Sequence, residues 1–146
     1  MTDSFFQAAI DEARLGLAEG GVPIGSVLVI DGEVVGHGPN QRVQRGSVVL
    51  HAEMAALEDA GRLTAADSRQ SVLSSTLSPC SMCTGAVLLY GIPRVVVGEN
   101  RTFQGPEDLL KDHGVVIEVL DDTVCVELMA TFIAEHPDLW NEDIGE

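Results

Sequence analysis

The sequence predicts an α/β domain in which helices cover a mixed sheet. Strand and helix patterns alternate along the chain in the order β-β-α-β-α-β-α, with helical segments at both ends. An Asp31-Gly32 dipeptide between apolar runs is typical of a two-residue β-hairpin turn. The apolar strand 94–98 is of the kind that lies buried between layers of helices. The length of 146 residues fits one domain, which we assign to residues 1–146.

The first predicted element is an amphipathic helix. Ser4 is a suitable N-cap, apolar side chains follow at helical spacing, and Gly20-Gly21 ends the pattern. Strands 27–30 and 33–35 then form the hairpin. Residues 36–47 are rich in turn-forming types and predict a loop. The apolar stripe of the helix consists of Phe6, Ala9, Ile10, Ala13 and Leu17.

Two helices are predicted in the middle of the chain. Residues 53–58 are strong helix formers, and Gly61 closes the run. Ser78-Pro79 predicts an N-cap followed by proline at the first helical position, which begins a helix of about 79–90. The other expected elements are a polar connection over 64–70, a short strand before residue 78, helix 107–112, strand 115–120 and a final helix 123–135 capped by Thr123.

One histidine and two cysteines have the spacing of a zinc site with three protein ligands. These are His51, Cys80 and Cys83, and two thiolates with one imidazole suit Zn²⁺ better than other metals. Three protein ligands leave the fourth tetrahedral position to water, which is typical of catalytic zinc. Both ligand segments are expected at helix starts, where the positive helix end favours thiolates. We therefore expect one Zn²⁺ per chain.

Glu53 follows the histidine ligand by two residues. This position suits proton transfer to and from the activated water better than metal binding, so we assign Glu53 as the catalytic acid and base. A redox Cys80-x-x-Cys83 pair would leave Glu53 unexplained. A closed structural zinc site needs a fourth ligand, and we expect the spare Cys125 to lie in the core. A zinc-binding interaction module without catalysis is the alternative of another class.

The charge balance indicates which kinds of partner the protein can bind. The chain carries 23 acidic and 8 basic residues, a formal net charge of −15, and the basic residues are scattered. Phosphate backbones are bound by clusters of Lys and Arg, so this composition disfavours nucleic acid and favours a small neutral substrate. The sequence has no apolar N-terminal signal segment, no membrane-spanning run and few cysteines, which favours a cytoplasmic protein without a membrane partner.

The H-x-E and P-C-x-x-C motifs at 51–53 and 79–83 are the signature of the zinc nucleobase deaminases. From about Gly16 onward, the chain resembles the cytidine/deoxycytidylate deaminase superfamily, and within it the yeast (fungal-type) cytosine deaminases. The resemblance implies a three-layer α-β-α sandwich with a mixed five-stranded sheet, a homodimer, and hydrolysis of free cytosine to uracil and ammonia in pyrimidine salvage. The segments that carry it are 21–25, 76–80, 90–94, 97–100 and 142–146.

The same resemblance implies the substrate contacts. Asn40, which by itself is a typical turn residue beside Pro39, hydrogen-bonds the pyrimidine. Asp143 accepts a hydrogen bond from the exocyclic amine, as an ionised carboxylate can. Trp140 and Phe103 form an aromatic lid. Without the resemblance, the tail would be interpreted as a frayed acidic end.

Three further residues are assigned to the substrate pocket. Ile24 lines it, and Ser78 lies in the segment that precedes the first cysteine ligand. Ala52 stands where the family has glycine, and its backbone N–H can still bind a substrate carbonyl. Its methyl group leaves the choice of base open, so the alternatives are isocytosine, 5-methylcytosine, guanine or another aminated ring, and a nucleoside.

Overall fold

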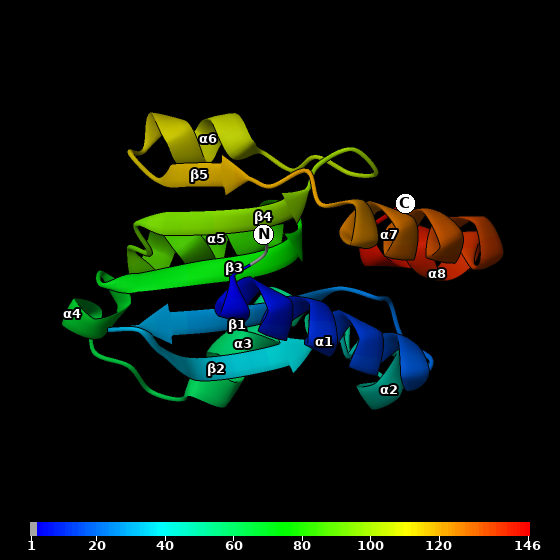
Figure 1. Ribbon diagram of the computed structural model, residues 1–146, viewed down its shortest axis with the longest axis horizontal. Coiled ribbons are helices and arrows are strands. Elements are labelled where there is room, and N and C mark those ends of the chain that lie inside the picture. Colours follow the sequence, from blue (N-terminus) through cyan, green and yellow to red (C-terminus); the bar gives the residue numbers. More distant parts are fainter. Residues whose placement is uncertain (1–2) are drawn as a thin grey trace.

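A mixed five-stranded sheet forms the centre of the computed structural model, which describes residues 3–146 (Figure 1). The strand order is β2-β1-β3-β4-β5. β1 runs antiparallel to both of its neighbours, whereas β3, β4 and β5 run parallel. The predicted mixed sheet is therefore confirmed. The strands are β1 (Gly25–Ile30), β2 (Glu33–Pro39), β3 (Ser71–Leu77), β4 (Arg94–Glu99) and β5 (Val116–Val119).

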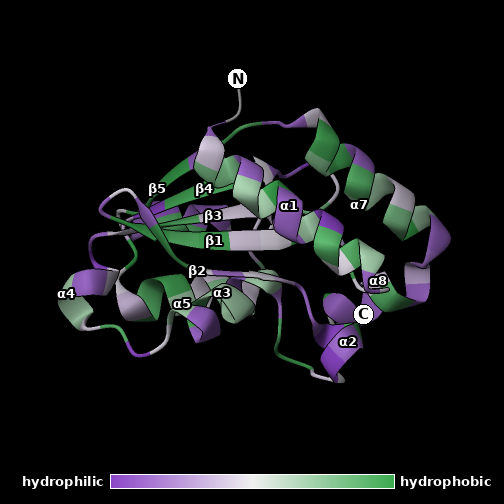
Figure 2. Ribbon diagram, turned by 60° about the horizontal axis from the view of Figure 1, so that its bottom comes forward, coloured by the Kyte–Doolittle hydropathy of each residue, from purple (hydrophilic) through white to green (hydrophobic). Residues whose placement is uncertain are grey.

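Helices cover both faces of the sheet, as the predicted three-layer sandwich requires. Figure 2 shows α1 on one side and α3 with α5 on the other. Alternate residues of β4 face opposite sides of the sheet and belong to two different apolar clusters. Val96 packs with Phe6 of α1, whereas Val95 and Val97 pack with Val87 of α5. The main helices are α1 (Ser4–Ala18), α3 (Ala52–Ala60), α5 (Ser81–Tyr90), α6 (Glu107–Asp112) and α7 (Thr123–Glu135).

The predicted hairpin is confirmed, but its second strand is longer than expected. Asp31 and Gly32 both have positive φ, 52° and 74°, as this turn requires. β2 continues to Pro39 because glycine lets α3 lie directly on the strand. A Cβ at Gly36 would approach the Ala56 carbonyl oxygen to 2.2 Å. The loop prediction for 36–47 is therefore wrong over β2, and also over the short helix α2 (Arg42–Arg45).

Two predicted helix caps are wrong by one residue. Asp3, not Ser4, caps α1 by accepting a 2.7 Å hydrogen bond from the Phe6 N–H. Asp122, not Thr123, caps α7 in the same way. The apolar stripe of α1 is confirmed except for Leu17, which is 42% exposed.

Besides α2, two more short helices were not predicted. α4 (Ala65–Ser68) lies within the expected polar connection and has a capping box between Thr64 and Asp67. α8 (Pro137–Asp143) follows α7, so the alternative interpretation of the tail as a frayed end does not hold. The expectation that Cys125 lies in the core is confirmed, since it is 1% exposed. Over residues 3–146, no helix is long and apolar enough to cross a membrane.

The strand directions bring several chain segments to one edge of the sheet. The carboxyl ends of β2, β3 and β4 and the beginning of β1 all face α7 and α8 (Figure 1). In parallel sheets, this edge is where ligand sites form. The residues that continue from these strand ends include Ile24, Asn40 and Ser78.

Candidate active site

Two helix N-termini hold the three predicted metal ligands. His51 is the N-cap residue of α3, Cys80 is the N-cap residue of α5, and Cys83 lies in the first turn of α5. The helix therefore begins at Ser81, and the prediction of an N-cap at Ser78 is wrong. Both cysteines still lie at the positive end of the helix, as expected, and this end favours the thiolate form.

The three ligand atoms have a separation that fits zinc. The His51 Nδ1 lies 3.3 Å from the Cys80 Sγ and 3.8 Å from the Cys83 Sγ, and all three atoms lie within 4.8 Å of one another. A tetrahedral ion with ordinary Zn–N and Zn–S bonds would separate nitrogen and sulfur by about 3.6 Å. Within residues 3–146, no other group of histidine, cysteine and acidic side chains converges in this way.

The ligands interact before any metal is considered. A hydrogen bond from the Cys83 thiol lowers the pKa of Cys80 to about 4, despite burial, and the same bond raises the pKa of Cys83. Burial lowers the pKa of His51, but its bond to Cys80 and the charges of Asp143 and Glu53 raise it to about 9 overall. A proton therefore competes with a metal for this imidazole.

Glu53 is the second residue of α3 and is only 4% exposed. Burial raises its pKa to about 7, a shift that the nearby His51 opposes. Because its pKa lies near neutrality, the carboxyl group can both take up and release a proton there. It shares a pocket wall with His51 and Cys80.

Most of the predicted pocket residues converge on one small, partly open pocket with about 10 Å³ of free space, close to the minimum for one water molecule. A larger open pocket of about 380 Å³ shares His51, Cys80, Phe103, Asp143 and Ile144 with it. Sequence reasoning missed Leu77 and Ile144 in the lining; their apolar character gave no functional signal. The predicted residues in the lining are Ile24, His51, Glu53, Ser78, Cys80, Phe103, Trp140 and Asp143.

The other two predicted pocket residues lie directly behind this lining. Asn40 is fully buried, and its Nδ2 donates a 2.7 Å hydrogen bond to the Asp143 Oδ1. Ala52 is also fully buried and belongs to the apolar cluster that includes Ile24 and Trp140. The structure thus brings all of the predicted substrate contacts to one place.

Asp143 is held between two partners. Its Oδ1 accepts from Asn40, and its Oδ2 lies 3.5 Å from the His51 Nε2. Burial raises the pKa of Asp143, while His51 and Asn40 oppose the rise. The Asn40 Oδ1 accepts from the Arg42 N–H, which fixes the orientation of the amide with its NH₂ toward Asp143. Because Nδ1 faces the thiols, Asp143 is placed to orient the ring through Nε2.

Two aromatic rings line the pocket. Phe103, from the loop between β4 and α6, meets Trp140 of α8 edge to face, with ring centroids 5.8 Å apart and planes at 82°. Trp140 is 6% exposed. The hydroxyl of Ser78 is directed to this same loop, since it accepts from the Gly105 N–H and donates to Glu107.

Residues 1–99 match the family model described as the cytidine and deoxycytidylate deaminase zinc-binding region. The chain is 53% identical to a cytosine deaminase of Candida albicans, over 96% of this chain and 94% of that protein. It is 35% identical to a tRNA-specific adenosine deaminase of Streptococcus pyogenes, over 90% of this chain and 89% of that protein.

The fold is also similar to that of a solved tRNA:A34 deaminase, with a TM-score of 0.72 and 27% identity, covering 85% of this chain and 97% of the other. Fold, ligand geometry and sequence agree: the chain belongs to the cytidine and deoxycytidylate deaminase family.

Proposed function

We propose that this protein is a zinc-dependent deaminase that hydrolyses free cytosine to uracil and ammonia. The observation that carries the proposal is the buried Asn40–Asp143 pair beside His51, because it presents one fixed donor and one fixed acceptor next to the metal ligands. The 53% identity with the Candida albicans cytosine deaminase over nearly the whole chain supports the same substrate. His51, Cys80 and Cys83 would hold the zinc.

The pair matches the polar edge of cytosine. Asp143 can accept a hydrogen bond from the exocyclic amine, because an ionised carboxylate has acceptor sites to spare after its bond with Asn40. The Asn40 NH₂ keeps a second hydrogen for the base. The Ala52 N–H lies at the start of α3, where backbone N–H groups have no partner within the helix, and can donate to the substrate carbonyl.

Glu53 moves the protons of the reaction. Zinc, when bound, lowers the pKa of water and supplies a nucleophile near neutral pH. As water attacks C4, Glu53 takes one of its protons and gives it to the ring nitrogen beside C4. A second transfer carries the remaining proton from the new C4 hydroxyl to the amine. The C4–N bond then breaks, ammonia leaves, and the C4 carbonyl of uracil remains.

The small inner pocket supports a small free base. It offers only about 10 Å³ of free space, so the lid of Phe103 and Trp140 must move to admit even cytosine. A ribose would need still more space beside the Phe103–Trp140 contact. Closure excludes bulk water during proton transfer. These features favour cytosine over cytidine.

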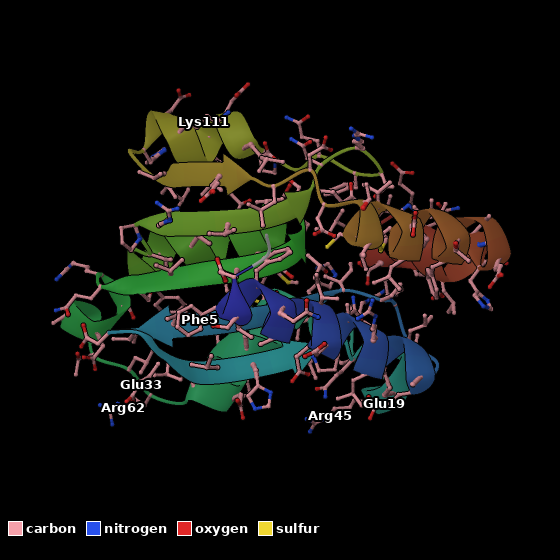
Figure 3. All side chains as sticks on the ribbon, viewed as in Figure 1. Phe5, Glu19, Glu33, Arg45, Arg62 and Lys111 are labelled. Carbon is pink, nitrogen blue, oxygen red and sulfur yellow. The ribbon has the colours of Figure 1, made fainter. Side chains whose placement is uncertain are left out.

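Charge favours a free base over tRNA as well. Arg45, Arg62 and Lys111 project from separate parts of the periphery (Figure 3), and the formal net charge is −15. A phosphate backbone would meet repulsion over most of the surface. Isocytosine, 5-methylcytosine and guanine are the remaining alternative substrates, because each has an aminated ring that Asn40 and Asp143 could bind.

We also propose a cytoplasmic homodimer, with residues 1–146 as one domain in each subunit. Large apolar side chains are exposed at the C-terminal end of α5 and in the segment before α3, including Leu89 at 74% and Val48 at 73%. Exposed apolar groups of this size mark surfaces that a second chain can cover. Sedimentation equilibrium tests this arrangement: we expect a dimer at micromolar concentration, and a monomer for Leu89→Glu. A monomeric wild type would contradict it.

Ammonia release by the zinc-loaded protein tests the proposed activity. Cytosine, cytidine, isocytosine, 5-methylcytosine, guanine and a tRNA are supplied separately, and zinc content is measured on the same sample. We expect rapid release from cytosine and little from cytidine or tRNA. Release from none of these compounds, with zinc fully bound, would favour the interaction module. Preference for another base would keep the chemistry but refute cytosine as the substrate.

A further inference from the structure

The loop 100–106, between β4 and α6, carries Phe103 of the lid. It runs across the segment 78–80 that leads into the first cysteine ligand. A Cβ at Gly105 would lie 1.8 Å from the Pro79 carbonyl oxygen, so the two backbones are in direct contact. Only glycine allows this approach. The position of Phe103 is therefore tied to the position of the metal-ligand segment.

Polar bonds between Ser78 and Glu107 join the two segments. The Ser78 hydroxyl donates a 2.6 Å hydrogen bond to the Glu107 Oε2 and accepts a 3.0 Å bond from the Gly105 N–H. Asn100, at the other end of the loop, donates to both oxygens of Glu107, at 3.2 and 3.4 Å. Ser78 and Glu107 are each 2% exposed. The single carboxylate of Glu107 thus holds both ends of the loop against the metal-ligand segment.

No cation accounts for the burial of Glu107. Among residues 3–146, the ion pairs do not include it, and its partners are a hydroxyl and an amide. Burying a carboxylate has a cost that such bonds offset only if all are made. Replacing this carboxylate with an apolar side chain would relieve that cost, so its presence calls for a role other than stability.

We infer that Ser78 and Glu107 are positioning residues, which fix the Phe103 loop to the metal-ligand segment and so hold the lid closed over the substrate. This inference rests on the proposed function for its kinetic consequence. It assigns the Ser78 hydroxyl to the loop, not to the substrate. Glu107 touches no reacting group. Its loss therefore lowers the fraction of molecules with a closed lid more than it lowers the rate of the chemical step.

Two variants and one matched control test the role of Ser78 and Glu107. Glu107→Gln keeps the size of the side chain but turns an NH₂ group toward one of its two donors. Ser78→Ala removes the hydroxyl that joins Gly105 and Glu107. Ser71→Ala is the control, because Ser71 is also fully buried, also donates a 2.6 Å bond, and lies at the opposite end of β3.

Trp140 gives a readout that does not depend on any substrate. It is the only tryptophan of the chain and packs against Phe103, so quenching of its fluorescence by acrylamide reports lid opening. We expect quenching to rise at least twofold in Glu107→Gln and in Ser78→Ala, and to stay unchanged in Ser71→Ala. The double variant should equal the stronger single one, because both remove the same connection.

The kinetic arm uses the zinc-loaded proteins. We expect KM for cytosine to rise by about tenfold, with a smaller change in kcat, since one bond to a charged group contributes on this order. Unchanged quenching in both variants, with midpoints of unfolding lowered as in Ser71→Ala, would overturn the inference and leave a purely structural role. If quenching rises in the variants but the wild-type protein does not act on cytosine, then the positioning role of Ser78 and Glu107 stands. The proposed substrate is refuted instead.

Discussion

Replacement of Asp143 by asparagine tests the substrate edge of the pocket. The change conserves shape, but it turns one acceptor oxygen into an NH₂ donor. The two groups that now face the carboxylate are both donors: the Asn40 Nδ2 at 2.7 Å and the His51 Nε2 at 3.5 Å. Whichever way the new amide turns, one donor meets another donor, and the acceptor proposed for the exocyclic amine is weakened.

The expected loss follows from the number and kind of these bonds. A hydrogen bond to a charged group contributes about 1.5–3 kcal/mol, and a buried donor left without a partner costs a similar amount. Asp143 is 7% exposed, so solvent does not replace the lost acceptor. Since 1.4 kcal/mol corresponds to a factor of ten, we expect kcat/KM for cytosine to fall by about 100-fold.

The assay is ammonia release with zinc content measured alongside, because Asp143 also faces a metal ligand. Asp138→Asn is the matched control: the same change in the same helix, at an exposed position. We expect that control to stay within about twofold of wild type, as surface changes usually do. If Asp143→Asn, with zinc fully bound, also stays within threefold, then the carboxylate does not hold the amine and the proposed orientation of the base is wrong.

Three further predictions follow. Glu53→Gln should keep its zinc and lose about 10²- to 10⁴-fold in kcat, because the amide cannot carry a proton; full activity would remove Glu53 from the mechanism. Removal of zinc by a chelator should lower the midpoint of thermal unfolding and added zinc should restore it, since the ion binds only the folded site; equal midpoints with and without zinc would contradict this. Gly36→Ala should destabilise the fold by about 1–3 kcal/mol in urea unfolding, because its Cβ would lie 2.2 Å from the Ala56 carbonyl; a neutral effect would mean that α3 can shift away from β2.

The ligand site could be predicted from sequence because its signals are short and chemically rare. His51, Cys80 and Cys83 are metal-binding residue types, and glycines mark the ends of both helices that carry them. The hairpin was predictable for the same reason, since only a few dipeptides accept positive φ at both positions. Neither prediction needs any knowledge of which segments meet in three dimensions.

The errors arise where neighbouring residues offer the same chemistry. Asp3 and Ser4 are equally good caps, as are Asp122 and Thr123, and the first of each pair is used because the backbone enters the helix there. α8 begins with Pro137 in its first turn, a typical helix-start signal, although no helix is predicted after residue 135.

The polar contacts of two buried glutamates could not be predicted. Glu107 and Ser78 are 29 positions apart, and each lies in a segment that looks like an ordinary helix start. Glu99 is fully buried at the end of β4, where it accepts from the backbone N–H groups of Arg101 and Thr102 and fixes the start of the lid loop. A glutamate is expected at the surface unless it is paired, so sequence alone places both carboxylates outside the protein.

A few of the acidic side chains belong to the site or to the segments that hold it, not to the surface. Glu53, Glu99, Glu107 and Asp143 are all less than 9% exposed, and all lie in the pocket wall or in the segments that hold it. These four are a minority of the 23 acidic residues, so most of the side chains behind the net charge of −15 are not buried in the site. Glu53 and Asp143 share the pocket wall with His51, and burial raises the pKa of both carboxyl groups. A divalent cation held by His51, Cys80 and Cys83 would offset that effect, because its charge favours the ionised form of a neighbouring carboxyl group.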